Sequence, residues 1–209
     1  MEAEQKKIID TLIAENKGKR KFTQSVELIV NFRGIDFTKV DNRLNLSIPL
    51  PYGKGKESKV AIIADDQNIV EKANSLNAKV IRSSELTEFS KNSSKQTELL
   101  NYELLAQPSL MPQIAKVLGQ FLGPRNKMPK PVTGNIEEAV KNIGSSINVR
   151  SKGKYLPTIH CMVVKENMDS DKITANIDSV LNEIIKKVGK HSVRSSYVKF
   201  TMSKPVKII

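Results

Sequence analysis

The sequence predicts a mixed fold in two parts. A discontinuous α+β domain, with an antiparallel sheet and helices, is expected from residues 1–57 and 147–209, and a Rossmann-like three-layer α/β domain is inserted at 58–146. Near both ends, apolar and polar residues alternate, which is typical of strands with one buried face. The middle third instead places short, wholly apolar runs between helical stretches, which is typical of a parallel sheet covered on both faces.

The first terminal part predicts one helix and two strands. Apolar residues recur on one face of a helix over 3–16, and a basic loop, 16–22, follows. Period-two alternation then predicts strands over 26–33 and 43–50. The segment 51–59 (PYGKGKESK) predicts a turn or linker. Because the chain must cross between the two domains twice, Gly53 and Gly55 are expected to form part of a hinge.

The middle third predicts a β-α-β-α-β-α series with right-handed crossovers. The expected strands are 59–64 (KVAIIA), 79–83 and 102–107, and the expected helices are 69–76, 84–91, 112–122 and 136–143.

The last third returns to alternating strands. Strands are expected at 147–151, 157–164 and 195–203 (SSYVKFTMS), and a helix with a continuous apolar stripe at 171–188. In the last strand, alternation places Lys199, Thr201 and Ser203 on one face and Met202 on the other.

The composition restricts the classes of function. The chain has 209 residues and a net charge of +12, of which the two terminal segments carry +10 and the middle segment +2. Such a surplus favours a polyanionic partner for the terminal domain. Without an apolar run of about 20 residues or a secretory signal at the start, no membrane association is expected. One cysteine and two histidines predict a cytoplasmic protein without disulfides or a metal site.

Residues that could carry catalysis do not form a recognisable constellation. No glycine-rich phosphate loop follows the strand at 59–64. Asp65 and Asp66 follow it instead, and we interpret them as loop or helix-capping residues. His160 and Cys161 are neighbours in a strand and are therefore expected to face opposite sides. We predict a non-enzyme without a cofactor, and the alternative is a nucleotide- or phosphosugar-using enzyme built on the middle domain.

Basic residues interleaved with hydroxyl and aromatic ones instead predict RNA binding. Lysine and arginine contact phosphates, an aromatic ring packs on a ribose or base, and hydroxyls reach the 2′-OH. With 5 % aromatic residues, recognition of a folded RNA is favoured over stacking of many bases. For the loop 16–22 the alternative is a solvated charge run, and for Phe22 a position in the core. The segments concerned contain Lys19, Arg20, Lys21, Phe22 and Thr23; Lys199, Thr201 and Ser203; and Arg150, Lys152 and Lys154.

A proline-rich loop in the middle domain, 122–131 (LGPRNKMPKP), is also basic. Prolines keep such a loop extended, so Arg125, Lys127 and Lys130 are expected to face solvent. The alternative is an ordered connection between a helix and the sheet.

Several of these segments together resemble one family. The chain is similar to the large-subunit ribosomal protein L-one family in its archaeal form, over essentially its whole length. The segments that carry the resemblance are KFTQSVEL (21–28), LPYGKGKESKVAII (50–63), QPSLMPQIAKVLGQFLGPRNKMPKP (107–131), INVR (147–150) and YVKFTMSKPVKI (197–208).

The resemblance implies a protein of the mobile ribosomal stalk that binds large-subunit rRNA, is monomeric when free, assists release of deacylated exit-site tRNA and represses its own operon mRNA. The implied RNA contacts are Phe22, Arg150, Thr201 and Met202, with Lys21, Thr23, His160, Tyr197 and Lys199 as neighbours. The chain departs from the family pattern at three places: Ser203 and Lys204 stand for a usual Gly-Pro pair, Asn126 for a common glycine, and Tyr52 for a common histidine.

Overall fold

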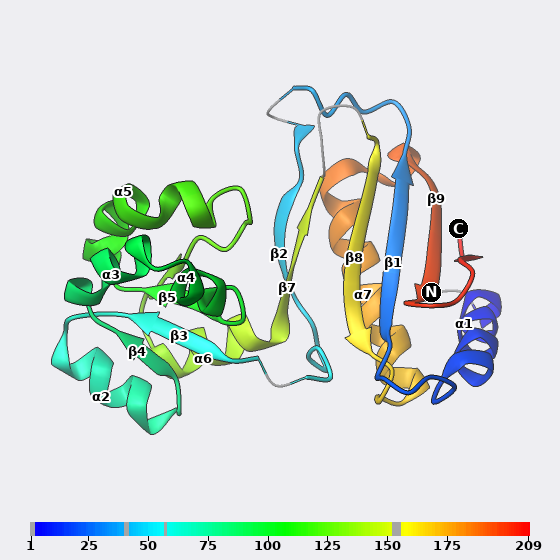
Figure 1. Cartoon of the computed structure of the whole chain (residues 1–209). Helices are drawn as coiled ribbons and strands as arrows, with labels where there is room; N and C mark the ends of the chain where they lie inside the picture. The colour runs from blue at the N-terminus through cyan, green and yellow to red at the C-terminus, as the bar shows by residue number, and fades with distance from the viewer. Residues whose placement is uncertain (1–2, 40–41, 57, 152–155) are drawn as a thin grey trace. The chain divides into compact units, whose positions relative to one another are not determined.

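The computed structural model describes residues 3–39, 42–56, 58–151 and 156–209. Contacts divide the chain into two compact units. The first comprises Met1–Lys56 and Ser145–Ile209, and the second comprises Glu57–Gly144. Both ends of the chain therefore contribute to the first unit (Figure 1).

The first unit contains a four-stranded antiparallel sheet in the order β10-β9-β1-β8. Its strands are β1 (Ser25–Phe32), β8 (Thr158–Lys165), β9 (Val193–Phe200) and β10 (Val206–Lys207). Along β1 every second side chain is fully or almost fully buried, as the alternation of its sequence predicts. A second, two-stranded antiparallel sheet joins β2 (Asn45–Pro49) to β7 (Ser146–Arg150).

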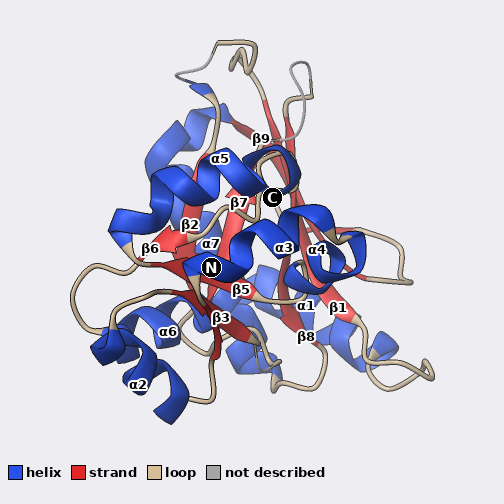
Figure 2. Cartoon of the chain, turned by 60° about the vertical axis from the view of Figure 1, so that its left-hand side comes forward, coloured by secondary structure: helices blue, strands red, loops and turns tan. Residues whose placement is uncertain are grey.

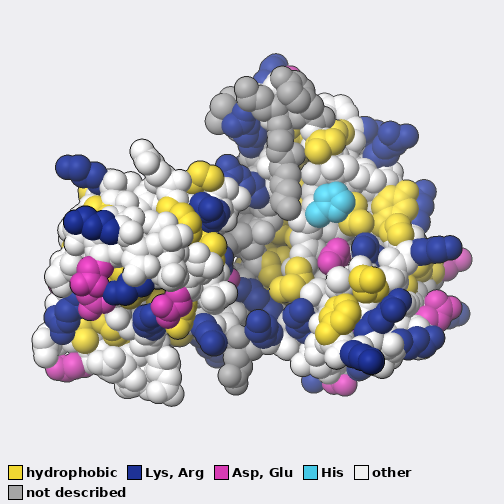
Figure 3. Space-filling view, in the orientation of Figure 1, with side chains coloured by type: hydrophobic (Ala, Val, Ile, Leu, Met, Phe, Trp, Pro, Cys, Tyr) yellow, Lys and Arg dark blue, Asp and Glu magenta, His cyan; other side chains and the backbone are white. Residues whose placement is uncertain are grey.

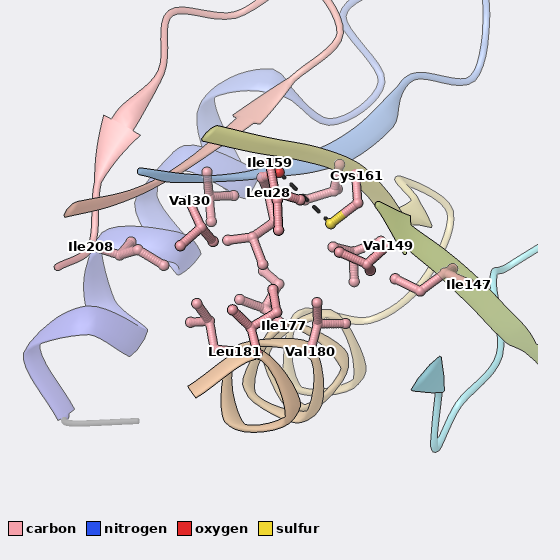
Figure 4. Packing of buried hydrophobic residues seen from close by; sticks show 14 of the residues in the cluster. Leu28, Val30, Ile147, Val149, Ile159, Cys161, Ile177, Val180, Leu181 and Ile208 are labelled. Carbon is pink, nitrogen blue, oxygen red and sulfur yellow. Dashed lines mark hydrogen bonds between the residues drawn. The ribbon is translucent and has the colours of Figure 1, made fainter. Parts of the chain in front are cut away.

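Two helices, α1 (Ala3–Asn16) and α7 (Ser170–Val188), bury one face of the four-stranded sheet. Figure 1 shows α7 lying behind the strands. In the core, Leu28 and Val30 of β1 lie opposite Ile177 and Leu181 of α7 (Figure 4). α7 is capped by Gly189, whose φ of 84° is costly for other residues. Lys186 and Lys187 lie in the last turn of α7, near the negative end of the helix dipole.

The second unit is a three-layer α/β structure around a parallel sheet of order β4-β3-β5-β6. Its strands are β3 (Val60–Ile63), β4 (Lys79–Ile81), β5 (Glu103–Ala106) and β6 (Lys130–Pro131). All four residues of β3 are buried, which is the reason for its uninterrupted apolar sequence.

Helices cover both faces of this sheet (Figure 2). One apolar cluster joins the sheet to α3 (Leu86–Lys91), α4 (Ser93–Leu99) and α5 (Met111–Leu122). The other joins it to α2 (Gln67–Ser75) and α6 (Ile136–Ser145). Short 3-10 turns lie at Ser83–Glu85, Pro108–Leu110 and, in the first unit, Lys190–Ser192.

The structure differs from the sequence prediction in four elements. β10 (Val206–Lys207), which pairs with β9, was not predicted. β9 ends at Phe200, so the strand expected over 195–203 is too long. Residues 201–203 form a turn, in which Met202 is exposed, whereas Phe200 is buried. α4 was not predicted; Asn92 caps it by accepting hydrogen bonds from the N–H groups of Ser94 and Lys95. β6 was not predicted either: Lys130 and Pro131 of the proline-rich loop pair with β5, and Pro131 is tolerated there because β6 is an edge strand of the sheet.

Candidate nucleic-acid interface

The outer face of the four-stranded sheet consists of the side chains that point away from α1 and α7. Because β1 pairs with β8 and β9, these side chains form rows across the sheet. One row contains Met162, Glu27 and Lys199, and the next contains His160, Ile29 and Tyr197. Figure 3 shows Lys and Arg side chains distributed around apolar side chains on this side of the unit. The outer face thus combines cationic, apolar and hydrogen-bonding groups.

A turn formed by residues 201–203, here called the 201–203 turn, lies at one end of the outer face. Thr201 is tied to the first residue of β1: its N–H donates to the Ser25 carbonyl at 3.0 Å. The Thr201 hydroxyl in turn accepts from the Ser25 N–H at 2.9 Å. Next to it, the side chain of Met202 is 57 % exposed. The turn therefore presents an apolar side chain from a backbone that is held in place.

The basic loop predicted from the sequence leads from α1 to the same end of β1. Lys19, Arg20, Lys21 and Thr23 are exposed. Phe22 is 51 % exposed, so the alternative of a core position for its ring is wrong. An exposed aromatic ring among cations suits contact with a nucleic acid, in which phosphates alternate with riboses and bases.

Two residues that the sequence analysis missed support this end of the sheet. The ammonium group of Lys165, at the end of β8, donates to the Ser25 hydroxyl at 2.8 Å. Gln24 is 2 % exposed and accepts a hydrogen bond from the Met202 N–H at 3.2 Å. The sequence around Gln24 gave no signal of burial, because two of the three partners of its side chain, Glu166 and Met202, lie more than 140 residues away.

Arg150 lies apart from the 201–203 turn. It ends β7, and β8 then begins opposite Asn31, near the carboxyl end of β1. Thr201 lies beside Ser25, at the other end of β1 (Figure 1). Lys152 and Lys154, the other members of the third basic cluster, lie outside the described residues. The predicted site residues are thus divided between the two ends of the unit, with His160, Tyr197 and Lys199 along the face between them.

His160 and Cys161 face opposite sides of β8, as predicted. His160 is exposed, whereas Cys161 is buried, and its thiol lies 3.8 Å from the Leu28 carbonyl oxygen (Figure 4). Burial, and secondarily the negative charge of Glu27, raises the pKa of the Cys161 thiol to about 12. The thiol is therefore protonated at neutral pH, and the structure forms no Cys–His pair here.

Asp65 and Asp66, at the carboxyl end of β3, are occupied by local hydrogen bonds. Asp65 accepts from the Ser83 N–H. Hydrogen bonding to the Ser83 side chain, and secondarily to its N–H, lowers the pKa of the Asp65 carboxyl group. Asp66 caps α2 by accepting from the Asn68 N–H. The Gln107 amide oxygen accepts from the N–H groups of both Asp65 and Asp66, at 3.2 and 3.3 Å. These two N–H groups could otherwise donate to a phosphate, but both already donate to the Gln107 side chain.

The described residues offer neither a metal site nor a membrane-spanning helix. No group of three or more His, Cys, Asp or Glu side chains there could hold a metal ion. Within the same part of the chain, no helix has the length and apolar character needed to cross a membrane.

Comparison with known proteins decides the family. The model of the ribosomal protein L1p/L10e family matches residues 12–204. The chain belongs to this family. It is 39 % identical to the large ribosomal subunit protein uL1 of Thermococcus kodakarensis over 90 % of this chain and 89 % of that protein. It is 40 % identical to uL1 of Pyrococcus horikoshii (90 and 88 %) and 39 % identical to uL1 of Methanothermobacter thermautotrophicus (91 and 92 %).

In this member of the L1p/L10e family, Ser203, which departs from the family pattern, has a structural role. Its hydroxyl accepts a hydrogen bond from the Phe200 N–H at 2.8 Å, and its own N–H donates to the Phe200 carbonyl at 3.1 Å. The Ser203 hydroxyl also donates to the Lys204 carbonyl at 3.0 Å. The Ser203 side chain thus holds the 201–203 turn against the last residue of β9, Phe200.

The proline-rich loop of this L1p/L10e protein is mostly an ordered connection. Arg125 is exposed and stacks on the Phe121 ring, 4.1 Å from its centroid. Lys127 is half-buried and bonds to the Tyr102 carbonyl at 3.2 Å and to the Glu103 carboxylate at 3.4 Å. Lys130 lies half-buried in β6. The expectation that all three cations face solvent is therefore wrong for Lys127 and Lys130. Lys127 is held by Tyr102 and Glu103, and Lys130 is held by the pairing of β6 with β5.

The predicted hinge glycines of this L1p/L10e protein adopt the left-handed conformation, with φ of 68° at Gly53 and 69° at Gly55. Both are tied to the first unit. The Asn176 amide donates to the Gly53 carbonyl at 2.9 Å, and the Asn167 amide donates to the Gly55 carbonyl at 3.1 Å. Tyr52 is exposed, and its N–H donates to Asn176.

Proposed function

We propose that this chain is a uL1 protein of the large ribosomal subunit and that its first unit binds a folded segment of large-subunit rRNA. The observation that carries the proposal is the end of the sheet where Phe22 and Met202, both more than half exposed, lie beside the exposed loop that holds Lys19, Arg20 and Lys21. Two comparisons also support the proposal. The chain belongs to the L1p/L10e family, and it aligns over about nine-tenths of its length with relatives named as large ribosomal subunit protein uL1.

The proposed mechanism divides affinity from specificity. Lys19, Arg20, Lys21 and Lys199 neutralise phosphates and release counterions, which supplies a salt-dependent, sequence-independent affinity. The groups held at fixed positions give specificity, since they fit one folded RNA: Phe22 and Met202 pack on riboses or bases, and the hydroxyls of Thr23, Thr201 and Ser203 lie near the RNA backbone. Tyr197 and His160 extend the contact along the outer face, and Arg150 meets a separate part of the RNA.

The domain organisation is proposed to serve the same role. Residues 1–57 and 147–209 form the rRNA-binding domain, and 58–146 form an inserted domain that faces exit-site tRNA. The segment with Gly53 and Gly55 is part of the hinge between them. The protein acts in the cytoplasm as a non-enzymatic part of the ribosome, is monomeric when free, assists release of deacylated tRNA, and represses its own operon mRNA through an rRNA-like site.

The proposal is tested by binding to a large-subunit rRNA fragment that carries the stalk element, beside a scrambled RNA of equal length, across a salt series. We expect a preference of about a thousandfold for the rRNA fragment that persists at physiological salt. Equal binding to both RNAs, lost together as salt rises, would leave a sequence-blind nucleic-acid binder and refute the proposal.

The enzyme alternative is tested by thermal unfolding with millimolar nucleotides or phosphosugars. A real site would raise the melting temperature by mass action. We expect no rise, because the Gln107 side chain occupies the Asp65 and Asp66 N–H groups at the edge where a parallel sheet binds ligands. A concentration-dependent rise of several degrees would favour the enzyme.

A further inference from the structure

Gln24 is placed to act on the RNA without touching it. The residue lies between the basic loop and β1, and it is 2 % exposed. A side chain so deeply buried is not available to a ligand. Its amide oxygen nevertheless accepts from the N–H of Met202, whose own side chain is 57 % exposed at the proposed interface.

The surroundings of the Gln24 amide permit one orientation. Its nitrogen donates to the Asn16 carbonyl at 3.1 Å and to the Glu166 carboxylate at 3.3 Å, and its oxygen faces the Met202 N–H at 3.2 Å. The first two partners only accept and the third only donates. A flipped amide would place its oxygen against two acceptors and its N–H groups against a donor. The orientation of the side chain is therefore dictated by its neighbours.

Gln24 also joins four separate segments of the first unit. Asn16 ends α1, Gln24 precedes β1, Glu166 follows β8, and Met202 follows β9. Glu166 is itself 6 % exposed, and its N–H donates to the Gln24 carbonyl at 3.1 Å. A buried carboxylate requires hydrogen-bond donors, so Glu166 holds the amide firmly in place.

The three residues of the 201–203 turn are held differently. The N–H groups of Thr201 and Ser203 donate to the main-chain carbonyls of Ser25 and Phe200. The N–H of Met202 instead donates to a side chain, that of Gln24. A substitution at Gln24 can therefore release Met202 while the main-chain bonds on either side remain.

We propose that Gln24, oriented by Glu166, is a positioning residue that fixes the Met202 backbone in the geometry needed for specific RNA recognition. This inference rests on the proposed function. A loosely held contact group loses much of its effect on affinity, because binding must then order it. Gln24 should therefore influence the preference among RNAs and leave general phosphate binding unchanged.

The test compares Gln24→Met, similar in length but without the amide, with the wild-type chain. We expect affinity for the rRNA fragment to fall about tenfold or more, while affinity for the scrambled RNA stays within about twofold. Hydrogen exchange should show faster exchange of the Met202 amide in this variant. Gln24→Asn is a second variant in case Gln24→Met does not fold. It keeps a buried amide but is one methylene shorter, and the same two changes are expected.

Asn176→Leu is the matched control. Asn176 is a fully buried amide of the same unit that binds Tyr52 and Gly53 and has no bond to the 201–203 turn. We expect this variant to lose stability but to keep the preference for the rRNA fragment. The inference is overturned if a folded Gln24 variant keeps the wild-type preference, or loses no more of it than Asn176→Leu. A wild-type chain without any preference would refute the proposed function instead.

Discussion

Thr201 and Ser25, which are 176 positions apart in the chain, are joined by paired hydrogen bonds. The Thr201 N–H donates to the Ser25 carbonyl, and the Ser25 N–H donates to the Thr201 hydroxyl. The bonds fasten the 201–203 turn to the start of β1, next to the segment that carries Phe22 and Thr23. Thr201, through its main-chain N–H and its hydroxyl, thus connects the two segments in which most of the predicted RNA contacts lie.

Thr201→Ala should weaken specific RNA binding far more than general binding. The change leaves the Ser25 N–H without its acceptor and removes a hydroxyl from the interface, and the loss of a paired polar group costs about 1–3 kcal/mol. We expect affinity for the rRNA fragment to fall about tenfold or more in filter-binding or calorimetric titrations. Thr201→Ser, which keeps the hydroxyl, should bind as the wild type does. Equal losses for both RNAs would contradict this role.

Lys19→Ala should have the opposite pattern. Lys19 is exposed in the basic loop, so its contribution is that of a charge near phosphates. Affinity for the rRNA fragment and the scrambled RNA should fall by similar factors, and the slope of log K against log salt should become less steep by about 0.7–0.9. Lys91→Ala, an exposed lysine at the end of α3 in the other unit, serves as the control. An unchanged slope in Lys19→Ala would show that this loop stays in solvent.

Cys161 should make the first unit sensitive to alkaline pH. The pKa of its thiol is about 12 in the fold, against 9.0 as the ordinary value, because burial disfavours the thiolate. The protonated thiol's contribution to stability is fully present below pH 9, and it is lost as the pH rises toward 12. In urea unfolding at pH 8, 9 and 10, the free energy of unfolding should fall more steeply in the wild type than in Cys161→Ala. The difference should be at most about 1.4 kcal/mol per pH unit. Parallel pH dependences would refute it.

Asn126 should tolerate glycine but not alanine. Its φ of 56° lies in the left-handed region, which asparagine and glycine enter readily. Asn126→Ala should therefore lower the free energy of unfolding of the second unit by about 1–2 kcal/mol, whereas Asn126→Gly should leave it nearly unchanged. Thermal unfolding of both variants measures this difference. A melting temperature of Asn126→Ala equal to that of the wild type would be inconsistent with the backbone conformation.

Local patterns predicted the elements best where burial follows the period of the element. Alternation predicted β1 and the buried side of β8, and the apolar stripe over 171–188 predicted α7 almost to its ends. The same rule failed after Phe200. Alternation continues through 201–203 in the sequence, but these residues bond to Ser25 and Phe200 and form a turn. α4 was missed because Leu99 is the one buried residue among its seven, so its sequence shows no apolar stripe.

The candidate site was predictable as a set of residue types but not as a place. The cations and hydroxyls of 19–23 and 199–203 could be predicted as candidate contacts, because such groups need solvent or a polar partner. The exposure of the Phe22 ring could not, because a core position was the alternative. The separation of Arg150 from Thr201 could not be predicted, because it depends on the direction of β7 and β8. The hydrogen bonds of Lys165 with Ser25 and of Gln24 with Met202 could not be predicted either, because they depend on the pairing of strands that are distant in the sequence.

The sequence by itself determined the mixed α/β class, the basic character of the terminal segments and the family, because these depend on composition, periodicity and local motifs. Only the tertiary structure decided which polar groups are buried, which cations are already paired, and which residues meet at the 201–203 turn. The physical reason is that a hydrogen bond needs both partners within about 3 Å. For Gln24 and Thr201 those partners are brought together by the antiparallel register of β1, β8 and β9.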